Sequence, residues 1–358
     1  MSTCVHIVKN AELECTGICR IVAGLAKHSP PLGYRISVLF LGRGPLAADL
    51  KEMGIPSSIV PWDGSRTDIA GAWNVWSWLR KHPAEIVHSH HGGLAVRAVC
   101  RMAGVRAIVQ HMHGRTLENK GGISVSELRF RAADAVIAAS QAVADCLQGC
   151  HAEVIYAGVE TAFQPPAQAP PTDALKLGIL GRLIPLKNVE AVINVAACLA
   201  DRGIDIEVAI AGSGPLEESL RALVARLGVG NRVRFLGWRT DIGALFGSWD
   251  VLVMPSLEEG FPLAALDAMA AACPVVASRI GGLSELIVDG VTGRLLPPGD
   301  TDSLVTCIAE LACDRRRLAQ MGLEGWKRAQ LNFSNDMMAR RTTALYDGLL
   351  SRGANFPI

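Results

Sequence analysis

Short apolar runs alternate with helical patterns through the first half of the chain. Strands are predicted at residues 5–8, 36–41, 59–60, 86–88, 107–110 and 135–138. Helices are predicted between them, at residues 17–28, 46–53, 68–81 and 93–103. Apolar strands that alternate with helices are typical of a parallel sheet covered on both faces. The first half therefore predicts one doubly wound α/β domain.

The alternation stops at a polar, proline-rich segment and then begins again. Residues 163–173 read F-Q-P-P-A-Q-A-P-P-T-D, which is the composition of a linker. Further strands are predicted at residues 177–180, 206–211, 233–236, 251–254 and 275–277. In parallel sheets of this kind, ligands bind outside the carboxyl ends of the strands.

The pattern as a whole predicts a fold of class α/β with two Rossmann-like, doubly wound parallel-sheet domains facing across a cleft. We expect one domain at residues 1–165, a second at residues 174–334 and, at 335–358, a helix that packs back on the first domain. A chain of 358 residues is also too long for one typical core, which favours two domains.

Charge and cysteine content narrow the class of protein. The chain has 35 basic and 34 acidic residues, which argues against nucleic acid as a main partner. Its ten cysteines lie mostly in apolar runs without C-x2-C pairs, as buried thiols of a reducing compartment do. The first residues form no apolar signal region, and no run approaches the roughly 20 apolar residues of a membrane span. We expect a cytoplasmic chain, and peripheral contact with the inner face of the membrane stays open.

One stretch of the second half combines acids, a glycine and the start of a helix. After the strand at 251–254, the chain passes through Glu258, Glu259 and Gly260 to a helix predicted at 263–272, with Pro262 in its first turn. The free N–H groups of a helix N-terminus beside such a loop form an anion site. A phosphorylated ligand is therefore expected here.

Two cations follow the strand at 177–180. Arg182 and Lys187 leave the carboxyl end of this strand, and the planar fork of arginine with the point charge of lysine suits two neighbouring phosphates. Taken alone, the segment is equally typical of a solvated loop. The anion-ready helix near Gly260 favours the phosphate interpretation. Asp267 lies among alanine, leucine and methionine, where a carboxylate without hydrogen-bond partners would cost free energy. It could accept hydrogen bonds from sugar or ribose hydroxyls.

Further short motifs fill the second half: A-G-S-G-P-L at 211–216, V-R-F-L-G-W at 233–238, M-P-S-L-E-E-G-F-P-L-x2-L-D-A-M-A at 254–270, G-G-L-S-E at 281–285 and D-G-V-T-G-R-L-L-P-P-G-D at 289–300. Together with G-R-L-x3-K at 181–187, they resemble a GT-B glycosyltransferase of the large retaining family 4. The resemblance covers nearly the whole second half.

The resemblance implies a hexosyltransferase (EC 2.4) that needs no cofactor and no metal. Its donor would be a nucleotide-diphosphate sugar, UDP-linked in preference to GDP-linked, carrying a hexose or N-acetylhexosamine. The acceptor would be a saccharide or a lipid-linked saccharide, in the synthesis of a cell-surface polysaccharide or glycoconjugate. It would bind the domain at residues 1–165, and the nucleotide sugar would bind the domain at residues 174–334.

The resemblance also implies roles for single residues. Arg182 and Lys187 would hold the diphosphate, Glu259 would contact the sugar hydroxyls, and His113, just before Gly114, would reach the donor sugar. Asp267 stands where the family has a ribose-binding glutamate that is one methylene longer. The remaining donor-binding candidates are Gly17, Gly214, Leu236, Gly260, Phe261, Pro262 and Leu263.

The first half resembles the family more weakly. Only Gly17 remains of the family's paired glycines after the first strand, and Ala157 stands where asparagine is usual. All nine histidines lie in this half, between His6 and His151.

Other functions remain possible at this point. Residues two apart on a strand face the same way, so His88 with His90 and His111 with His113 could bind zinc, as in a metal-dependent hydrolase. However, the second half offers no histidine to complete the site. A nucleotide-sugar epimerase of the same fold and a non-catalytic saccharide or nucleotide binder are further alternatives.

Two more features have a structural and a functional interpretation. Trp73 and Trp76, on the predicted helix at 68–81, could touch lipid or acceptor, although core packing is the commoner role at this spacing. Asp300 and Asp302 could hold a metal, but helix capping suits their position before a predicted helix.

Overall fold

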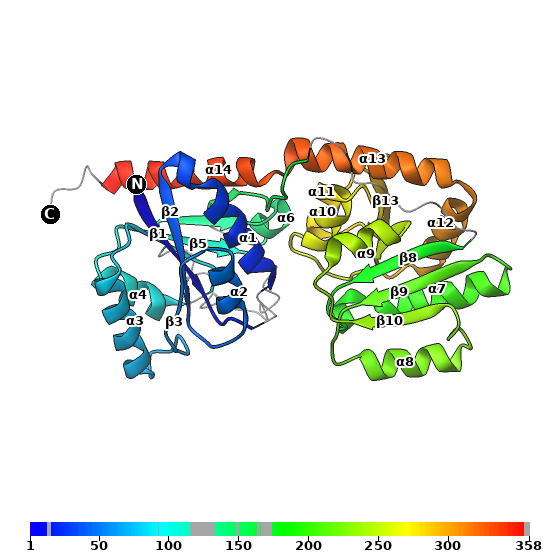
Figure 1. Ribbon diagram of the computed structural model, residues 1–358, viewed down its shortest axis with the longest axis horizontal. Helices are drawn as coiled ribbons and strands as arrows, with labels where there is room; N and C mark the ends of the chain where they lie inside the picture. Colours follow the sequence, from blue (N-terminus) through cyan, green and yellow to red (C-terminus); the bar gives the residue numbers. More distant parts are fainter. Residues whose placement is uncertain are drawn as a thin grey trace. The chain divides into compact units, whose positions relative to one another are not determined.

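The computed structural model describes residues 1–12, 16–91, 93–114, 133–147, 150–162, 165 and 174–353. The chain forms two compact units, each built around its own sheet (Figure 1). Unit 1 comprises Met1–Glu160 with Ser334–Ile358, and unit 2 comprises Thr161–Phe333. The linker predicted at 163–173 lies, except for Pro165, outside the described residues.

Unit 1 is built on a seven-stranded parallel sheet. The strands, in spatial order, are β3 (Ser57–Ile59), β2 (Tyr34–Phe40), β1 (Ser2–Val8), β4 (Ile86–Ser89), β5 (Ala107–Met112), β6 (Ala135–Ala138) and β7 (Ala152–Val154). The helices described in this unit are α1 (Thr16–His28), α2 (Leu46–Glu52), α3 (Ile69–Lys81), α4 (Leu94–Met102), α6 (Gln141–Ala144) and α14 (Asn335–Gly353).

Unit 2 repeats the arrangement with a six-stranded parallel sheet. Its strands, in spatial order, are β10 (Val233–Gly237), β9 (Ile206–Ala211), β8 (Leu175–Leu180), β11 (Val251–Met254), β12 (Val275–Ser278) and β13 (Gly293–Leu296). Its helices are α7 (Val189–Asp201), α8 (Glu217–Arg226), α9 (Ile242–Ser248), α10 (Leu263–Ala270), α11 (Gly281–Leu286), α12 (Thr301–Cys313) and α13 (Arg315–Asn332). The predicted pair of doubly wound parallel sheets is confirmed, while β7 and β13 lie outside the predicted strands.

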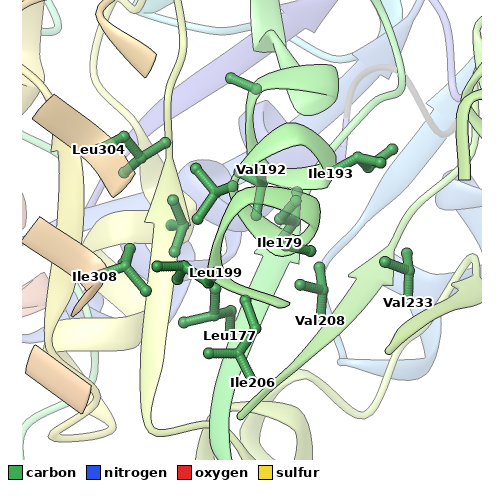
Figure 2. Packing of buried hydrophobic residues seen from close by; sticks show 14 of the residues in the cluster. Leu177, Ile179, Val192, Ile193, Leu199, Ile206, Val208, Val233, Leu304 and Ile308 are labelled. Carbon is green, nitrogen blue, oxygen red and sulfur yellow. The ribbon is translucent and has the colours of Figure 1, made fainter. Parts of the chain in front are cut away.

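Side chains from strands and helices interlock in the core of unit 2 (Figure 2). Leu177 and Val208 of the sheet pack against Val192 and Leu199 of α7, and Ile308 of α12 belongs to the same cluster. Fully burying one such side chain contributes about 1.5–3 kcal/mol. The apolar pattern that predicts these elements is therefore also what holds the sheet and its helices together.

The C-terminal helix α14 contributes to the core of unit 1. The side chain of Tyr346 is fully buried, and the hydroxyl of Tyr34 donates a 2.6 Å hydrogen bond to Asp347. Gly24 of α1 approaches Asn335 so closely that a Cβ at Gly24 would lie 2.5 Å from the side-chain oxygen of Asn335. Among the described residues, no helix combines the length and the apolar character needed to cross a membrane.

The strand order reverses once in each sheet. In unit 1 the reversal lies between β1 and β4, and in unit 2 between β8 and β11. The crevice outside the carboxyl ends of strands at such a reversal is where doubly wound folds bind their ligands. Ligand sites are therefore expected at these two positions.

Candidate functional site

The loop after β11 leads from the strand reversal of unit 2 into α10. Pro262 occupies the N-cap of α10 with extended backbone angles, rather than the first helical turn that the sequence predicts. The helix ends at Ala270, short of the predicted 272, because Ala272 turns into the left-handed region with φ of 56°. No side chain caps the start of α10. The first N–H groups of this helix can therefore serve an anion.

Lys187 and Glu259 meet at the same edge of the sheet. The Nζ of Lys187 donates a 2.5 Å hydrogen bond to Oε1 of Glu259, and the buried hydroxyl of Ser256 donates a 2.8 Å bond to the same oxygen. The side chain of Glu259 is only 9% exposed, so the ion pair compensates a carboxylate that has little water around it. Sequence reasoning missed Ser256, whose signal is its position three residues before Glu259.

Arg182 lies shortly before Lys187 in the chain and supplies a second cation. It follows Gly181 at the end of β8, its side chain is exposed, and it pairs with no acid among the described residues. Lys187 ends a short 3-10 turn, Pro185–Lys187, and the neighbouring carbonyl of Leu186 accepts a 2.8 Å bond from the N–H of Leu257. This bond joins the loop that carries the cations to the loop that carries Glu259.

Glycines let these loops approach one another. A Cβ on Gly282 would lie 2.2 Å from the carbonyl oxygen of Gly260, to which the Gly282 N–H donates a 2.9 Å bond. A Cβ on Gly214 would lie 2.4 Å from the carbonyl oxygen of Leu183. The structure thus gives Gly214 a packing role, holding the loop after β9 against the loop after β8.

The other predicted residues of unit 2 lie in the loop after β11, in α10, at the end of β10 and at the start of α12. Phe261 and Pro262 are buried beside Gly260, whereas Leu263 is half-buried in the first turn of α10. Asp267 lies one turn further along this helix and is half-buried. Leu236 is half-buried at the end of β10. Asp300 is the N-cap of α12 and accepts a 2.9 Å bond from the N–H of Ser303, so the predicted helix capping is confirmed.

The strand reversal of unit 1 holds a cluster of five histidines: His6 on β1, His88 on β4, His90 after β4, His111 on β5 and His113 after β5. Four of these side chains are buried and His113 is half-buried. The predicted pairing of faces is confirmed, since the rings of His88 and His90 lie 4.7 Å apart and those of His111 and His113 4.1 Å apart. Gly17 lies in the first turn of α1 in the same unit.

Hydrogen bonds link the histidines in two series. His113 Nε2 lies 2.8 Å from His90 Nδ1, and His90 Nε2 lies 2.8 Å from His6 Nδ1. In the second series, His111 Nδ1 lies 3.1 Å from His88 Nε2, and His88 Nδ1 lies 2.6 Å from the hydroxyl of Tyr346. Sequence reasoning missed His6, although its register opposite His88 follows once β1 and β4 are known to be neighbours.

Burial keeps this cluster neutral. Desolvation lowers the pKa of both His6 and His111 from 6.5 to about 3. Desolvation, together with the neighbouring imidazoles, also holds the pKa of His88, His90 and His113 well below the usual value. Neutral imidazoles can ligate metal, and two overlapping triads, His6–His88–His90 and His90–His111–His113, bring their nitrogens within 4.8 Å of one another.

Arg182, Lys187, Glu259 and the α10 residues belong to unit 2, whereas Gly17 and His113 belong to unit 1. Within unit 2 the structure brings Lys187 and Glu259 together, whereas no hydrogen bond or ion pair among the described residues joins Arg182 to them or Gly17 to His113.

Family models match both halves of the chain. Residues 174–314 match the model described as Glycosyl transferases group 1, and residues 16–163 match the model described as Glycosyltransferase Family 4.

Curated relatives are similar over all or part of the chain. The lipopolysaccharide core biosynthesis mannosyltransferase LpsB of Rhizobium meliloti is 33% identical over 364 residues, which cover 96% of this chain and 97% of the relative. The MMP alpha-(1->4)-mannosyltransferase of Mycolicibacterium hassiacum is 33% identical over 207 residues, which cover 56% of this chain and 49% of that protein.

Among solved structures, HepE of Anabaena in complex with UDP and glucose has the same fold. The TM-score is 0.83 at 21% sequence identity, and the match covers 97% of this chain and 100% of that one.

Proposed function

Because this chain belongs to the GT-B glycosyltransferases of group 1 and family 4, we propose that it moves a hexose or N-acetylhexosamine from a nucleotide-diphosphate sugar to a saccharide or lipid-linked saccharide, with retention of anomeric configuration. One observation carries this proposal. Lys187, Glu259 and the uncapped start of α10 occupy the carboxyl edge of unit 2 at its strand reversal. A sugar diphosphate has phosphate oxygens that can bind the cations and the free N–H groups, and sugar hydroxyls that can donate to the carboxylate.

The reaction builds negative charge on the leaving diphosphate as the glycosidic bond breaks. Arg182, Lys187 and the N–H groups of α10 would stabilise that charge, which is usually the largest contribution to such catalysis. These groups supply positive charge without a metal ion, so we propose a metal-independent transfer. The acceptor hydroxyl would attack from the face that the diphosphate leaves and pass its proton to the departing phosphate.

Before a ligand binds, Lys187 and Glu259 neutralise each other in an ion pair. A diphosphate that binds Lys187 would replace Glu259 as the partner of its ammonium group. Glu259, still held by Ser256 at 2.8 Å, would then be available to the hydroxyls of the sugar. Donor binding would thus exchange one anionic partner of Lys187 for another, while the Glu259 carboxylate would keep hydrogen bonds from Ser256 and gain those of the sugar hydroxyls.

The relatives suggest two candidate donors. A UDP-linked hexose is the first candidate, because HepE of Anabaena binds UDP and glucose. A GDP-linked sugar is the second, and mannose is a candidate sugar because the 33% identical relative is a mannosyltransferase of lipopolysaccharide core biosynthesis. A role in cell-surface polysaccharide synthesis agrees with that relative.

Two measurements test the proposed function. Thermal shifts with UDP, GDP, ADP and TDP would identify the base, since a ligand that binds the folded state raises its apparent stability. Labelled donors of the same base, incubated with lipid-linked and free saccharide acceptors, should then give a product that retains the anomeric configuration by NMR. An isomerised donor would indicate an epimerase instead, and an unchanged donor a non-catalytic binder.

We also propose peripheral contact with a membrane through the outer face of α3. Ile69 is 76% exposed and Trp73 is 62% exposed, and the rings of Trp73 and Trp76 lie 4.6 Å apart. The expectation that these tryptophans belong to the core is wrong for Trp73. Arg80 is exposed one turn beyond Trp76 on the same face. An exposed tryptophan and an exposed isoleucine beside a basic group suit the interface of an anionic membrane.

Sedimentation with vesicles tests this contact. The wild-type chain should bind vesicles that contain phosphatidylglycerol, and the double variant I69A/W73A should bind about tenfold less, because it loses most of the exposed apolar area. Leu331→Ala on α13 is the matched control, since Leu331 is 73% exposed but lies in unit 2. Equal binding by wild type and I69A/W73A would contradict the proposal.

A further inference from the structure

The three histidines of the first series meet nitrogen to nitrogen. His90 and His113 have ring centres 5.0 Å apart and nitrogens 2.8 Å apart, and His6 and His90 have ring centres 5.1 Å apart with the same nitrogen separation. These separations of the ring centres are close to the largest that such short nitrogen contacts allow. The rings therefore lie edge to edge, with each pair of facing nitrogens sharing one proton.

This geometry favours hydrogen bonds over a metal site. Ligands of one ion must point their lone pairs at a common centre, at metal–nitrogen distances of about 2.0–2.1 Å. Here the nitrogens point directly at one another, at a separation that leaves no room for an ion between them. No described carboxylate forms a hydrogen bond or an ion pair with any of the five histidines to offset a buried divalent charge.

A neutral imidazole carries one N–H and one lone pair, so the polarity of one ring fixes the polarity of the next. If His6 donates from Nδ1, then His90 must donate from Nδ1 to Nε2 of His113. His113 is then protonated on Nδ1. In the opposite polarity, every ring is protonated on Nε2 instead.

The buried end of the series decides between the two polarities. His6 Nε2 is buried and has no hydrogen-bond partner. With the second polarity it would be an N–H group without an acceptor, and orphaned buried N–H groups are rarer than unpaired acceptors. With the first polarity it is only an unpaired lone pair. The first polarity is therefore favoured.

We infer that His6, His90 and His113 form a polarised chain of neutral imidazoles that presents the Nδ1–H of His113 as a hydrogen-bond donor at the half-buried end of β5. His6 and His90 are then positioning residues, because they set the tautomer of His113 without contacting a ligand. That this N–H meets an oxygen of the sugar rests on the function proposed above. The Nδ1 of His113 has no partner among the described residues, so it is available to one.

Nitrogen NMR of the full chain with 15N-labelled histidine tests the inference directly. His6, His90 and His113 should each be protonated on Nδ1 and unprotonated on Nε2 at neutral pH. The signals can be assigned by their loss in the variants H6N, H90Q and H113Q, with exposed His82→Gln as a control. Protonation of His113 on Nε2, or signals shifted by a bound zinc ion that elemental analysis confirms, would overturn it.

A pair of variants at His6 tests the consequence for turnover. His6→Asn keeps an amide N–H where Nδ1 lies, so it should preserve the Nδ1–H tautomer of His113. His6→Leu removes that N–H, and kcat/KM should fall about tenfold, the worth of one hydrogen bond. Equal activity of the two variants, with equal His113 tautomers, would contradict the role of His6. Because the NMR experiment needs no substrate, it stands even if no sugar is transferred.

Discussion

The ion pair between Lys187 and Glu259 joins two side chains that the proposed reaction needs separately. The pair stands 72 residues apart in the chain and is closed by a 2.5 Å hydrogen bond. Each partner limits what the other can bind before a ligand arrives. A diphosphate can separate them because it offers Lys187 an equivalent negative partner.

Replacing either phosphate-binding cation should lower transfer, and at Arg182, which is exposed, it should do so with little effect on stability, whereas loss of Lys187 also leaves the buried Glu259 carboxylate without its cation. We expect Lys187→Ala and Arg182→Ala each to lower kcat/KM at least 100-fold, since each removes a positive charge from the leaving diphosphate. The matched control is Arg226→Ala, at an exposed position on α8. Steady-state kinetics together with a thermal melt of each variant would check this. Near-normal turnover in both site variants would refute the phosphate assignment.

Asp267 is expected to bind the ribose rather than the diphosphate. Its carboxylate is one methylene shorter than the family's glutamate, and it lies in α10, one turn after Leu263. If it accepts hydrogen bonds from the ribose, Asp267→Asn should weaken nucleotide binding about tenfold or more, because bonds to a charged group are lost. Asp267→Glu should then be weaker than wild type but stronger than Asp267→Asn. Titration calorimetry with the nucleoside diphosphate measures both, and equal affinities in all three chains would remove Asp267 from the site.

At the scale of elements, the glycines of the G-G-L-S-E segment determine where the loop after β11 can lie. The start of α11 packs against the backbone of Gly260, and Gly281 has a φ of 42°. Adding one carbon at Gly282 would force the carbonyl of Gly260 to move, since the two atoms would be 2.2 Å apart. The anion site thus depends on an element that need not touch the ligand.

We expect Gly282→Ala to destabilise unit 2 by about 1–3 kcal/mol, as overpacking does, and to weaken donor binding as well. The control is Gly243→Ala in α9, where an added Cβ meets nothing within 4 Å and should stabilise the helix by up to about 1 kcal/mol. Urea denaturation and nucleotide titration of the two variants would show the contrast. If both alanines behave alike, close packing at Gly282 is not what shapes the loop.

Elements with a long apolar run were predictable, and elements defined by their neighbours were not. The predicted strand at 206–211 has the bounds that the structure gives β9. In contrast, β7 has three half-buried residues, and β13 reads G-R-L-L; both form because an adjacent strand offers hydrogen bonds.

The same holds for the candidate site. Motifs identified Glu259 and Lys187, because the resemblance assigns them roles, but their ion pair depends on the approach of β8 and β11. The histidine motifs on β4 and β5 were visible as alternating positions. His6 was not, since nothing in a sequence shows that β1 lies beside β4.

Across the whole molecule, we expect the two units to differ in how their stability responds to acid. All nine histidines precede residue 152, and five of them are gathered in one neutral cluster of unit 1. The pKa of each clustered histidine is lowered by burial, to about 3 for His6 and His111. In the unfolded chain these groups return to ordinary values near 6.5.

Because the folded pKa values lie below the unfolded ones, the unfolded state binds more protons as the pH falls from 6.5 towards 3. The stability of unit 1 is therefore fully present above about pH 6.5 and is lost below it. Each histidine that stays neutral in the folded state while it takes up a proton in the unfolded state lowers the free energy of unfolding of unit 1, and all five act in the same direction. Hydrogen exchange measured by mass spectrometry at pH 7.5 and pH 5.5 should show peptides of unit 1 losing protection, while peptides of unit 2, which has no histidine, keep it. Parallel loss of protection in both units would contradict the acid sensitivity of the cluster, and full protection of unit 1 at pH 5.5 would mean that its imidazoles are not buried neutral.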